Sequence, residues 1–320
     1  MRRLFENCRC HRQSGGARSK RWEVTLILLS HINVISPRSI DEALKALDVH
    51  RENIRIVAGS TDVSVMLKDG NMKEKLFLDV SRLDDLKCVK IGRDGLIHIG
   101  AVATYGDCIR SPIIRKNAKV LVESFLTIGS PQIRNLATVG GNLGTASPAG
   151  DSIPALFAMN AVVTLQSLSG KREMSIEEFL EGYRKTKRDP NELITEVKLR
   201  RVRKGEVTFF RKLGLRHANA ISLASIAFCG QVVEGPRFAD ARIAFGAVAP
   251  TGIRAKRAEK VLVGYRFNSE TINEVARCCA QETRPISDIR GSAGYRRKAV
   301  EGLTRMSFLE VLDGLTEAGS

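Results

Sequence analysis

The residues best suited to chemistry in this chain lie at 128–158, where glycine, hydroxyl and amide residues crowd around a glycine pair. Because glycine has no Cβ and tolerates a positive φ, Gly140 and Gly141 would let backbone N–H groups converge on an anion such as a diphosphate. Asn142 adds a short hydrogen-bonding side chain, and Asp151 could accept hydrogen bonds from a ribityl or ribose chain. We therefore predict a loop whose backbone approaches a ligand.

A second loop of similar composition occurs earlier in the chain. An apolar strand at 54–57 runs into AGSTD at 58–62, and the helical pattern VSVMLKDG begins directly afterwards. Gly59 supplies the turn, and Ser60, Thr61 and the first helical N–H groups would donate to phosphate oxygens at the positive end of the helix dipole. Glycine turns before capped helices are common, so each loop alone is weak evidence. The two together favour a nucleotide site.

The elements that must position these loops follow from hydrophobic periodicity and turn residues. Ser39 predicts the N-cap of a helix over SIDEALKAL, with acidic residues in its first turn. The other predicted elements are strands at 89–91 and 96–99, a helix at 111–128, strands at 161–166, 192–199 and 207–212, a helix at 221–227, a strand at 240–248, and helices at 255–263, 269–280 and 292–312.

Four segments occur in an order and spacing that resemble a known family: AGSTD at 58–62, SPQIRNLATVGGN at 130–142, ASPAGDSIPAL at 146–156 and FFRKLGLRHANAISLASIA at 209–227. Together they resemble the FAD-binding subunit of molybdenum hydroxylases. The resemblance is greatest to the xanthine dehydrogenase FAD subunit of bacteria, and the medium subunit of carbon monoxide dehydrogenase is a relative. It covers nearly the whole chain, from about residue 31 to about residue 315.

The resemblance implies an α+β fold. It predicts a two-subdomain FAD-binding domain of the PCMH type at 31–205, followed by a smaller α+β flavoprotein domain at 206–315. The two subdomains would lie at about 31–87 and 88–205. Residues 1–30 remain as an N-terminal extension that relatives usually lack, and we expect this extension to be disordered.

The resemblance also assigns residues to FAD. The first flavin loop maps to Ile56–Val63 and the second to Thr138–Asn142, both around the diphosphate. Asp151 matches an acid among the flavin contacts, and Ile128 matches a side chain that packs on the isoalloxazine. With two residues of the last motif, near the flavin ring, the predicted FAD-binding set is Ile56, Val57, Ala58, Gly59, Ser60, Thr61, Asp62, Val63, Ile128, Thr138, Val139, Gly140, Gly141, Asn142, Asp151, Phe210 and Lys212.

Two positions depart from the family pattern. Ser60 stands where the family usually has a second glycine, so it must keep a negative φ or bear a strain on the order of 1 kcal/mol. Asn219 stands where many members carry an acid, which removes a charge but leaves a role in a turn. A Rossmann domain is a poor alternative, because the spacing of the glycines in VGGNLG does not supply G-x-G-x-x-G.

The implied function is that of an electron-transfer subunit in which FAD performs the redox chemistry and no side chain acts as catalytic acid or base. Its expected partners are a [2Fe-2S] small subunit and a molybdopterin large subunit, with NAD+ or another electron acceptor. We predict the xanthine dehydrogenase type. The alternatives are a flavoprotein subunit of the carbon monoxide, nicotinate or aldehyde dehydrogenase type, or a non-catalytic flavin- or nucleotide-binding module.

Composition agrees with these predictions. A length of 320 residues with 43% hydrophobic residues fits two or three compact domains. No run of 18 apolar residues occurs, so we expect no membrane span and a cytoplasmic location. The seven cysteines form no CxxC pair, so we expect no metal site here and any iron–sulfur cluster on another chain. The net charge is +16, but aromatic residues do not alternate with the basic residues as they do in many nucleic-acid-binding surfaces. We therefore expect no nucleic-acid partner.

Overall fold

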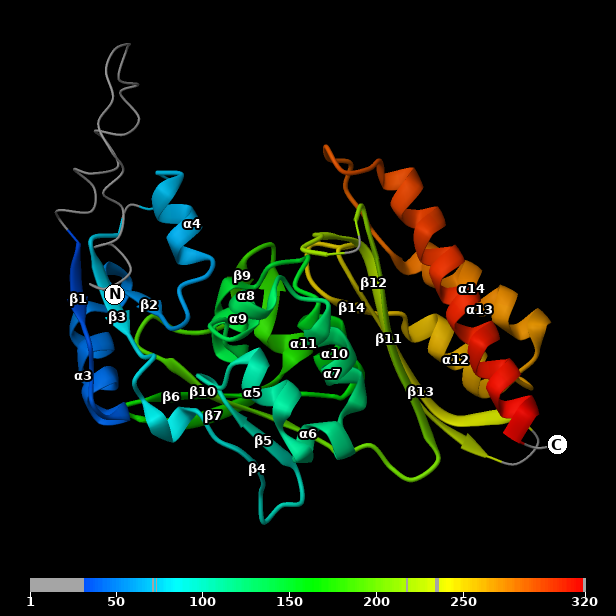
Figure 1. The fold of residues 1–320 in the computed structure, drawn as a ribbon, viewed down its shortest axis with the longest axis horizontal. Coiled ribbons are helices and arrows are strands. Elements are labelled where there is room, and N and C mark those ends of the chain that lie inside the picture. The colour runs from blue at the N-terminus through cyan, green and yellow to red at the C-terminus, as the bar shows by residue number, and fades with distance from the viewer. Residues whose placement is uncertain (1–31, 71, 73, 217, 234–235, 319–320) are drawn as a thin grey trace, which may run out of the picture.

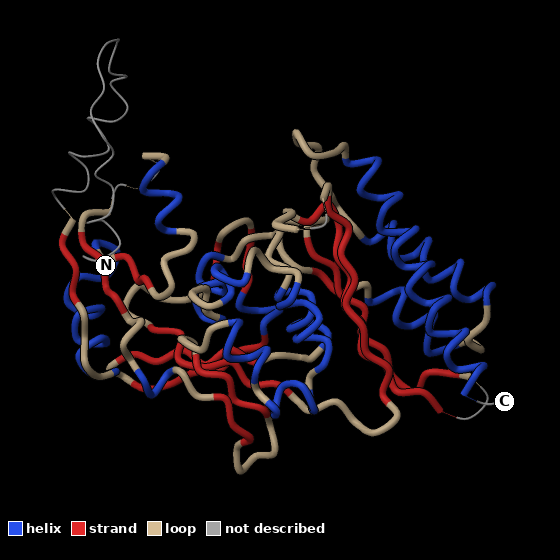
Figure 2. Tube along the Cα trace, in the orientation of Figure 1, coloured by secondary structure: helices blue, strands red, loops and turns tan. Residues whose placement is uncertain are grey.

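The computed structural model describes residues 32–70, 72, 74–216, 218–233 and 236–318. The predicted N-terminal extension lies outside these residues, so its expected disorder stays a prediction. Sheets of three, five and four strands follow one another along the chain (Figure 1). Helices gather around the sheets in segregated groups (Figure 2), which confirms the α+β class.

The first region is built on a parallel sheet with the order β1-β3-β2. Its helix α3 begins after Ser39, whose side chain accepts the N–H of Glu42 at 3.2 Å, and this confirms the predicted N-cap. The elements of this region are β1 (Asn33–Ile35), α3 (Ile40–His50), η1 (Arg51–Asn53), β2 (Arg55–Val57), α4 (Val63–Lys68), β3 (Leu76–Asp79) and η2 (Asp84–Leu86). The first glycine loop therefore leaves the carboxyl end of a parallel strand, where ligands of open α/β sheets usually bind.

The second region contains an antiparallel sheet with the order β4-β5-β10-β6-β7. Its strands are β4 (Val89–Ile91), β5 (Ile97–Gly100), β6 (Val162–Ser167), β7 (Gly170–Ser175) and β10 (Leu193–Leu199), and β8 (Leu180–Gly182) pairs with β9 (Lys185–Thr186). Its helices are α5 (Tyr105–Arg110), α6 (Pro112–Asn117), α7 (Lys119–Leu126), α8 (Pro131–Arg134), α9 (Val139–Thr145), α10 (Ser152–Ala158) and α11 (Ile176–Phe179).

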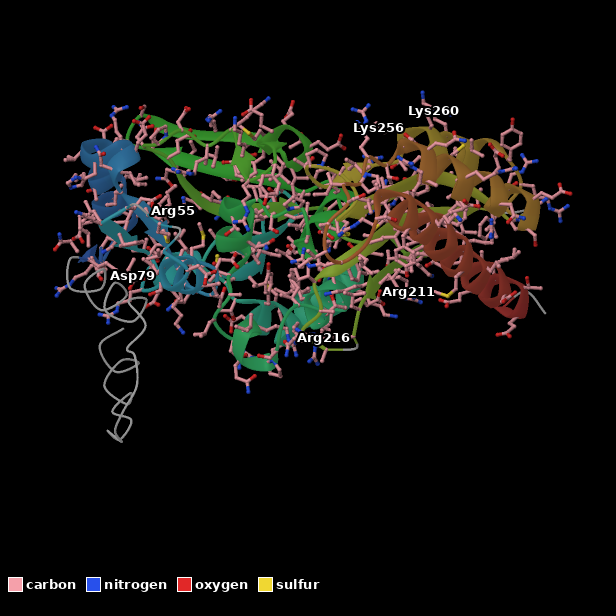
Figure 3. All side chains as sticks on the ribbon, turned by 90° about the horizontal axis from the view of Figure 1, so that it is seen from above. Arg55, Asp79, Arg211, Arg216, Lys256 and Lys260 are labelled. Carbon is pink, nitrogen blue, oxygen red and sulfur yellow. The ribbon has the colours of Figure 1, made fainter. Side chains whose placement is uncertain are left out.

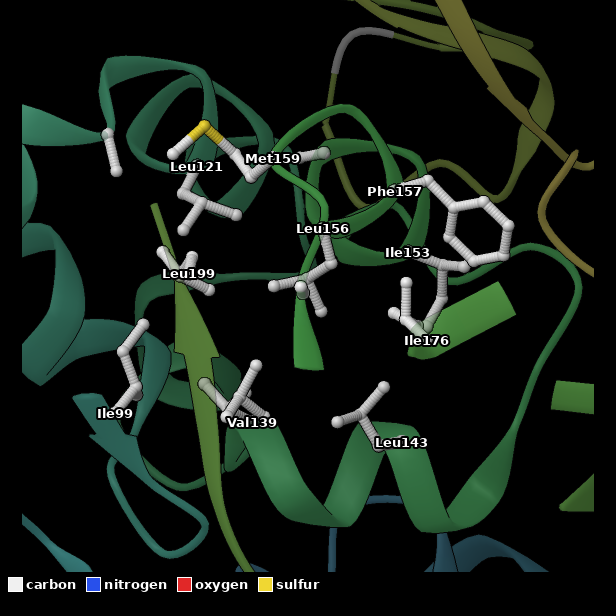
Figure 4. Packing of buried hydrophobic residues seen from close by; sticks show 14 of the residues in the cluster. Ile99, Leu121, Val139, Leu143, Ile153, Leu156, Phe157, Met159, Ile176 and Leu199 are labelled. Carbon is white, nitrogen blue, oxygen red and sulfur yellow. The ribbon is translucent and has the colours of Figure 1, made fainter. Parts of the chain in front are cut away.

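The core of the second region lies between this sheet and helices α7, α9 and α10. Figure 4 shows side chains from these elements facing one another, among them Leu121, Val139, Leu156 and Leu199. All four side chains are buried, with at most 1% of their surface exposed. The helix that carries the second glycine loop is thus fixed by its apolar side.

The predicted single helix at 111–128 is wrong in its middle. It is divided into α6 and α7 at Ala118, whose φ of −152° is not helical. The carbonyl of Asn117 accepts the N–H of Val202 at 2.8 Å, and the N–H of Leu121 bonds to Ala118 instead. A tertiary hydrogen bond therefore takes the place of a helical one, which the local sequence could not indicate.

The third region is an antiparallel sheet covered on both faces. It consists of β11 (Glu206–Gly214), β12 (Ser222–Val233), β13 (Arg237–Gly246) and β14 (Ile253–Arg254), followed by α12 (Lys256–Gly264), α13 (Ser269–Glu282) and α14 (Ala293–Ala318). The last three helices cover one face (Figure 1), and α7 and α10 of the second region pack on the other. The predicted helix at 221–227 is wrong, because this segment belongs to β12, a central strand buried on both faces that shows no alternation of polar residues.

Candidate functional site

A cavity of about 500 Å³ brings the two glycine loops together. Its walls come from the first sheet, from the turn before α8, from α9 and from the segment between β9 and β10. The predicted residues that line it are Ile56, Val57, Ala58, Gly59, Ser60, Thr61, Asp62, Val63, Ile128, Thr138, Gly140, Gly141 and Asn142. The volume is within the range of small-molecule and cofactor sites.

Gly59 lies where the first loop touches the segment that leads into the second. A Cβ added to Gly59 would come within 1.7 Å of the Leu136 carbonyl oxygen, a distance that no side chain can occupy. The glycine is therefore required for the close approach of two backbones. Ser60, the next residue, has a φ of 56°, so the strained alternative of the sequence analysis is the one observed.

The backbone N–H groups of the first loop remain available to a ligand. Those of Gly59, Ser60, Thr61 and Asp62 donate no hydrogen bond to any residue that the structure describes. A residue in the left-handed region beside residues of negative φ turns successive N–H groups toward one side, which is the geometry of an anion-binding nest. The first loop thus has the donors that a diphosphate needs.

The second loop is organised differently from the prediction. Gly140 and Gly141 belong to helix α9 and have no positive φ, so the predicted loop is the start of a helix here and the tolerance of glycine for a positive φ is not used. Their N–H groups are also engaged, that of Gly140 with the Ala101 carbonyl at 2.8 Å and that of Gly141 with Thr138 Oγ1 at 3.0 Å. The expected convergence of these two N–H groups on an anion is therefore wrong as well, because helix capping and the neighbouring strand already use them.

Gly140 and Gly141 of α9 serve two different contacts. A Cβ on Gly140 would lie 2.6 Å from the Ala101 Cβ, so this glycine allows the helix to pack on the sheet. A Cβ on Gly141 would meet only Thr138 Oγ1, at 2.8 Å, and otherwise faces open space. The lack of a side chain at Gly141 therefore leaves space for a ligand on this side of the cavity. Val139, between Thr138 and Gly140, points into the core and does not line the cavity (Figure 4).

Asp151 lies in a buried polar cluster outside the cavity lining. Its carboxylate is 2.5 Å from Lys212 Nζ and also accepts hydrogen bonds from the hydroxyls of Ser222 and Thr127. Burial raises the pKa of Asp151, and the Lys212 ammonium and the Ser222 hydroxyl oppose that rise without cancelling it. The cluster joins the second region to the third, since Ser222 and Lys212 come from β12 and β11.

Phe210 and Lys212, two residues apart on β11, lie on the same face of the strand, toward the second region, and do not line the cavity. Phe210 is 4% exposed, packs in the core of the second region, and donates its N–H to Glu123 at 2.8 Å. Lys212 donates to the Thr127 carbonyl at 3.1 Å, immediately before Ile128 of the lining. The structure therefore places Lys212 and Asp151 one residue behind the cavity wall, and Phe210 in the interior.

The sequence analysis missed one wall of the cavity. This wall includes Arg55 at the start of β2 and the segment from Arg188 to Ile194. Figure 3 shows Arg55 on the first sheet, far from Arg211 and Arg216 of the third region. Nothing in the sequence of the turn at 189–191 indicates that it faces the glycine loops. Antiparallel pairing of β10 with β5 and β6 brings it there.

Among the residues that the structure describes, no His, Cys, Asp and Glu side chains form a group of three or more that could hold a metal ion. In the same part of the chain, no helix has both the length and the apolar character needed to cross a bilayer.

Two protein families match the chain in succession. The family described as "FAD binding domain in molybdopterin dehydrogenase" matches residues 30–199, which is more than half of the chain. The family described as "CO dehydrogenase flavoprotein C-terminal domain" matches residues 209–311. The first match contains both glycine loops, and the second runs from within β11 to within α14.

The similarity to individual relatives covers most of the length of each relative. The chain is 33% identical to the glyceraldehyde dehydrogenase medium chain of Sulfolobus acidocaldarius, over 87% of this chain and 97% of the relative. It is 28% identical to the putative xanthine dehydrogenase FAD-binding subunit of Escherichia coli K12, over 81% and 88% of the two chains. Among solved structures, carbon monoxide dehydrogenase of Hydrogenophaga pseudoflava superimposes with a TM-score of 0.83 at 26% identity, over 86% of this chain and 95% of the other.

Proposed function

Because this chain belongs to the family of FAD-binding domains in molybdopterin dehydrogenases, and is thus an FAD-binding component of an oxidoreductase, we propose that it is the electron-transfer subunit of a molybdenum hydroxylase. FAD, when bound, supplies one- and two-electron chemistry that no side chain can perform. Electrons would arrive from [2Fe-2S] clusters of a small subunit and leave to NAD+ or another acceptor, while a molybdopterin large subunit oxidises the substrate.

The observation that carries the proposal is the pair of glycine loops on one cavity. The residues fit a flavin dinucleotide, because the loop at 58–62 offers four unused N–H groups and Gly141 places no side chain in the cavity. The chain's own part is to bind and orient the cofactor. We propose that all seventeen predicted residues form this site, with Val139, Asp151, Phe210 and Lys212 supporting it from behind.

The finer assignments are parts of the same proposal. We propose the xanthine dehydrogenase type, a cytoplasmic location, and two domains that meet near Gly205. The putative xanthine dehydrogenase subunit of E. coli supports the type at 28% identity. The 33% identity to a glyceraldehyde dehydrogenase medium chain favours an aldehyde as the second candidate substrate class.

The test is a redox titration of the purified chain. We expect a yellow protein whose flavin absorption is bleached by dithionite and restored by NAD+ or, if NAD+ is not the acceptor, by another oxidant such as ferricyanide. A bound flavin that no oxidant restores would contradict electron transfer and favour a binding module. Co-expression with the neighbouring subunits, followed by reduction with xanthine or with glyceraldehyde, separates the two substrate classes.

A further inference from the structure

Arg188 is a cation that faces the cavity with half of its guanidinium unused. Its Nη1 donates to the carbonyl oxygens of Asp189, Pro190 and Glu192, at 2.9, 3.4 and 2.7 Å. Its Nε and Nη2 donate to no residue that the structure describes, and neither belongs to the fully buried polar atoms without a partner. Both atoms therefore reach open space. Arg188 is among the residues that line the cavity.

The carboxylates near Arg188 are committed to other arginines. Glu192 accepts hydrogen bonds from Nε and Nη2 of Arg172, at 2.6 and 2.8 Å, and from the N–H of Asp189. Arg55, the other arginine of this wall, lies 3.6 Å from Glu74. Burial lowers the pKa of Arg188, the nearby Glu192 carboxylate opposes this without cancelling it, and Arg55 lowers the pKa further. Arg188 thus carries a partly desolvated positive charge without a carboxylate on its free edge.

The cavity lining includes apolar side chains, among them Ile128 and Ile133, and cations, among them Arg55 and Arg188. Arg188 is close enough to Arg55 for the two charges to affect each other, and Ile194 of the same segment approaches the later part of α9, where a Cβ on Gly144 would lie 3.9 Å from it. A flavin dinucleotide needs both kinds of surface, because it has an apolar isoalloxazine at one end and an adenylate at the other.

We propose that Arg188 binds the ADP half of FAD through Nε and Nη2, and so makes the cavity select the dinucleotide over flavins that lack the adenylate. The inference rests on the proposed placement of FAD in this cavity. The Nε–Nη2 edge of a guanidinium donates two parallel hydrogen bonds to phosphate oxygens, and its plane stacks on an aromatic base. Because Nη1 is fixed by three carbonyls, little side-chain entropy is lost when the ligand binds.

The experiment uses the full chain, freed of flavin, and isothermal titration with FAD, ADP and riboflavin. In Arg188→Gln, the affinity for FAD and for ADP should fall about 10-fold to 100-fold, as expected for hydrogen bonds to a charged group, while the affinity for riboflavin stays unchanged. Arg188→Lys should recover only part of the loss, because it keeps the charge without the planar edge. Arg201→Gln removes an exposed arginine outside the cavity and should change none of the three affinities.

The outcomes separate this inference from the proposed site. An unchanged affinity for ADP in Arg188→Gln overturns the inference, and so does an equal loss for ADP and riboflavin with a lower melting temperature, which would indicate collapse of the turn at 189–191. Gly141→Val is the control for the cavity. If Gly141→Val retains wild-type FAD affinity, the proposed FAD site is itself wrong. If Gly141→Val loses FAD affinity while Arg188→Gln does not, the proposed FAD site stands and only the role of Arg188 is wrong.

Discussion

The two glycine loops have nearly the same composition and different physical roles. At 58–62 the loop follows a parallel strand, Ser60 has a φ of 56°, and four N–H groups are unused within the described part of the chain. At 138–142 the residues form the cap and first turn of α9, and the N–H groups of Gly140 and Gly141 are engaged. The first loop therefore offers donors, and the second offers space.

This difference shows that small residues have to be interpreted by what surrounds them. Gly59 and Gly140 are required because other backbone or side-chain atoms occupy the place of a Cβ. Gly141 has the same chemistry but borders the cavity. Substitutions at these positions should therefore separate folding from cofactor binding.

The largest effect is expected at Gly59. In Gly59→Ala, the Cβ would overlap the Leu136 carbonyl, so the two backbones must move apart, and we expect the free energy of unfolding to fall by about 3 kcal/mol or more. Urea unfolding measures this loss. Gly302→Ala, in α14 with no atom near the added Cβ, should instead stabilise the chain by about 0.5 to 1 kcal/mol. Equal stability of the two variants would contradict the close approach.

Substitution of Asp151 tests whether the segment after α9 stabilises the fold or contacts the cofactor. Asp151→Ala leaves the Lys212 ammonium, whose side chain is 10% exposed, without its carboxylate, and the expected loss of stability is about 3 to 5 kcal/mol. The double variant Asp151→Ala with Lys212→Met should recover most of this loss, since no unpaired charge remains. Thermal unfolding of the three proteins checks the expectation, and a double variant as unstable as Asp151→Ala would count against the pair.

Gly141→Val should separate binding from stability. The added side chain meets Thr138 Oγ1 and otherwise enters the cavity, so we expect the affinity for FAD to fall at least about tenfold, a loss of about 1.4 kcal/mol. The helical backbone at this position accepts valine, but the Cβ displaces the N-cap hydroxyl of Thr138, so we expect the fold to be retained with a loss of stability of about 1 kcal/mol. Flavin fluorescence and circular dichroism measure the two quantities. Gly182→Val, outside the cavity, should retain both.

The smallest effect is expected at Ser60. Ser60→Gly relieves a positive φ, while glycine raises the entropy of the unfolded chain, so the net gain in stability should not exceed about 1 kcal/mol. Because the backbone N–H groups of the loop are unchanged, the affinity for FAD should stay within about threefold. A large loss of FAD in this variant would mean that the serine hydroxyl, rather than the backbone, binds the ligand.

Local sequence was sufficient to predict the elements whose ends are marked by capping or turn residues. Ser39 marks the start of α3 as predicted, and the strands predicted at 89–91 and 96–99 are found as the antiparallel pair β4 and β5, joined by a turn in which Gly95 has a φ of 76°. Prediction of the helices and strands failed where tertiary contacts, rather than local sequence, decide the secondary structure. β12 is apolar because both of its faces are covered, and α6 ends because the Asn117 carbonyl bonds to Val202.

The sequence by itself determined the family, the cofactor and the two segments rich in glycine, because short motifs with required residue types survive at fixed spacing along the chain. Tertiary structure alone decided which glycine makes room for a backbone and which borders the cavity. It also decided that Arg188, more than forty residues beyond the second loop, shares a cavity with both loops. The physical reason is that sheet pairing, a long-range interaction, sets which segments meet, whereas a motif records only its own neighbours.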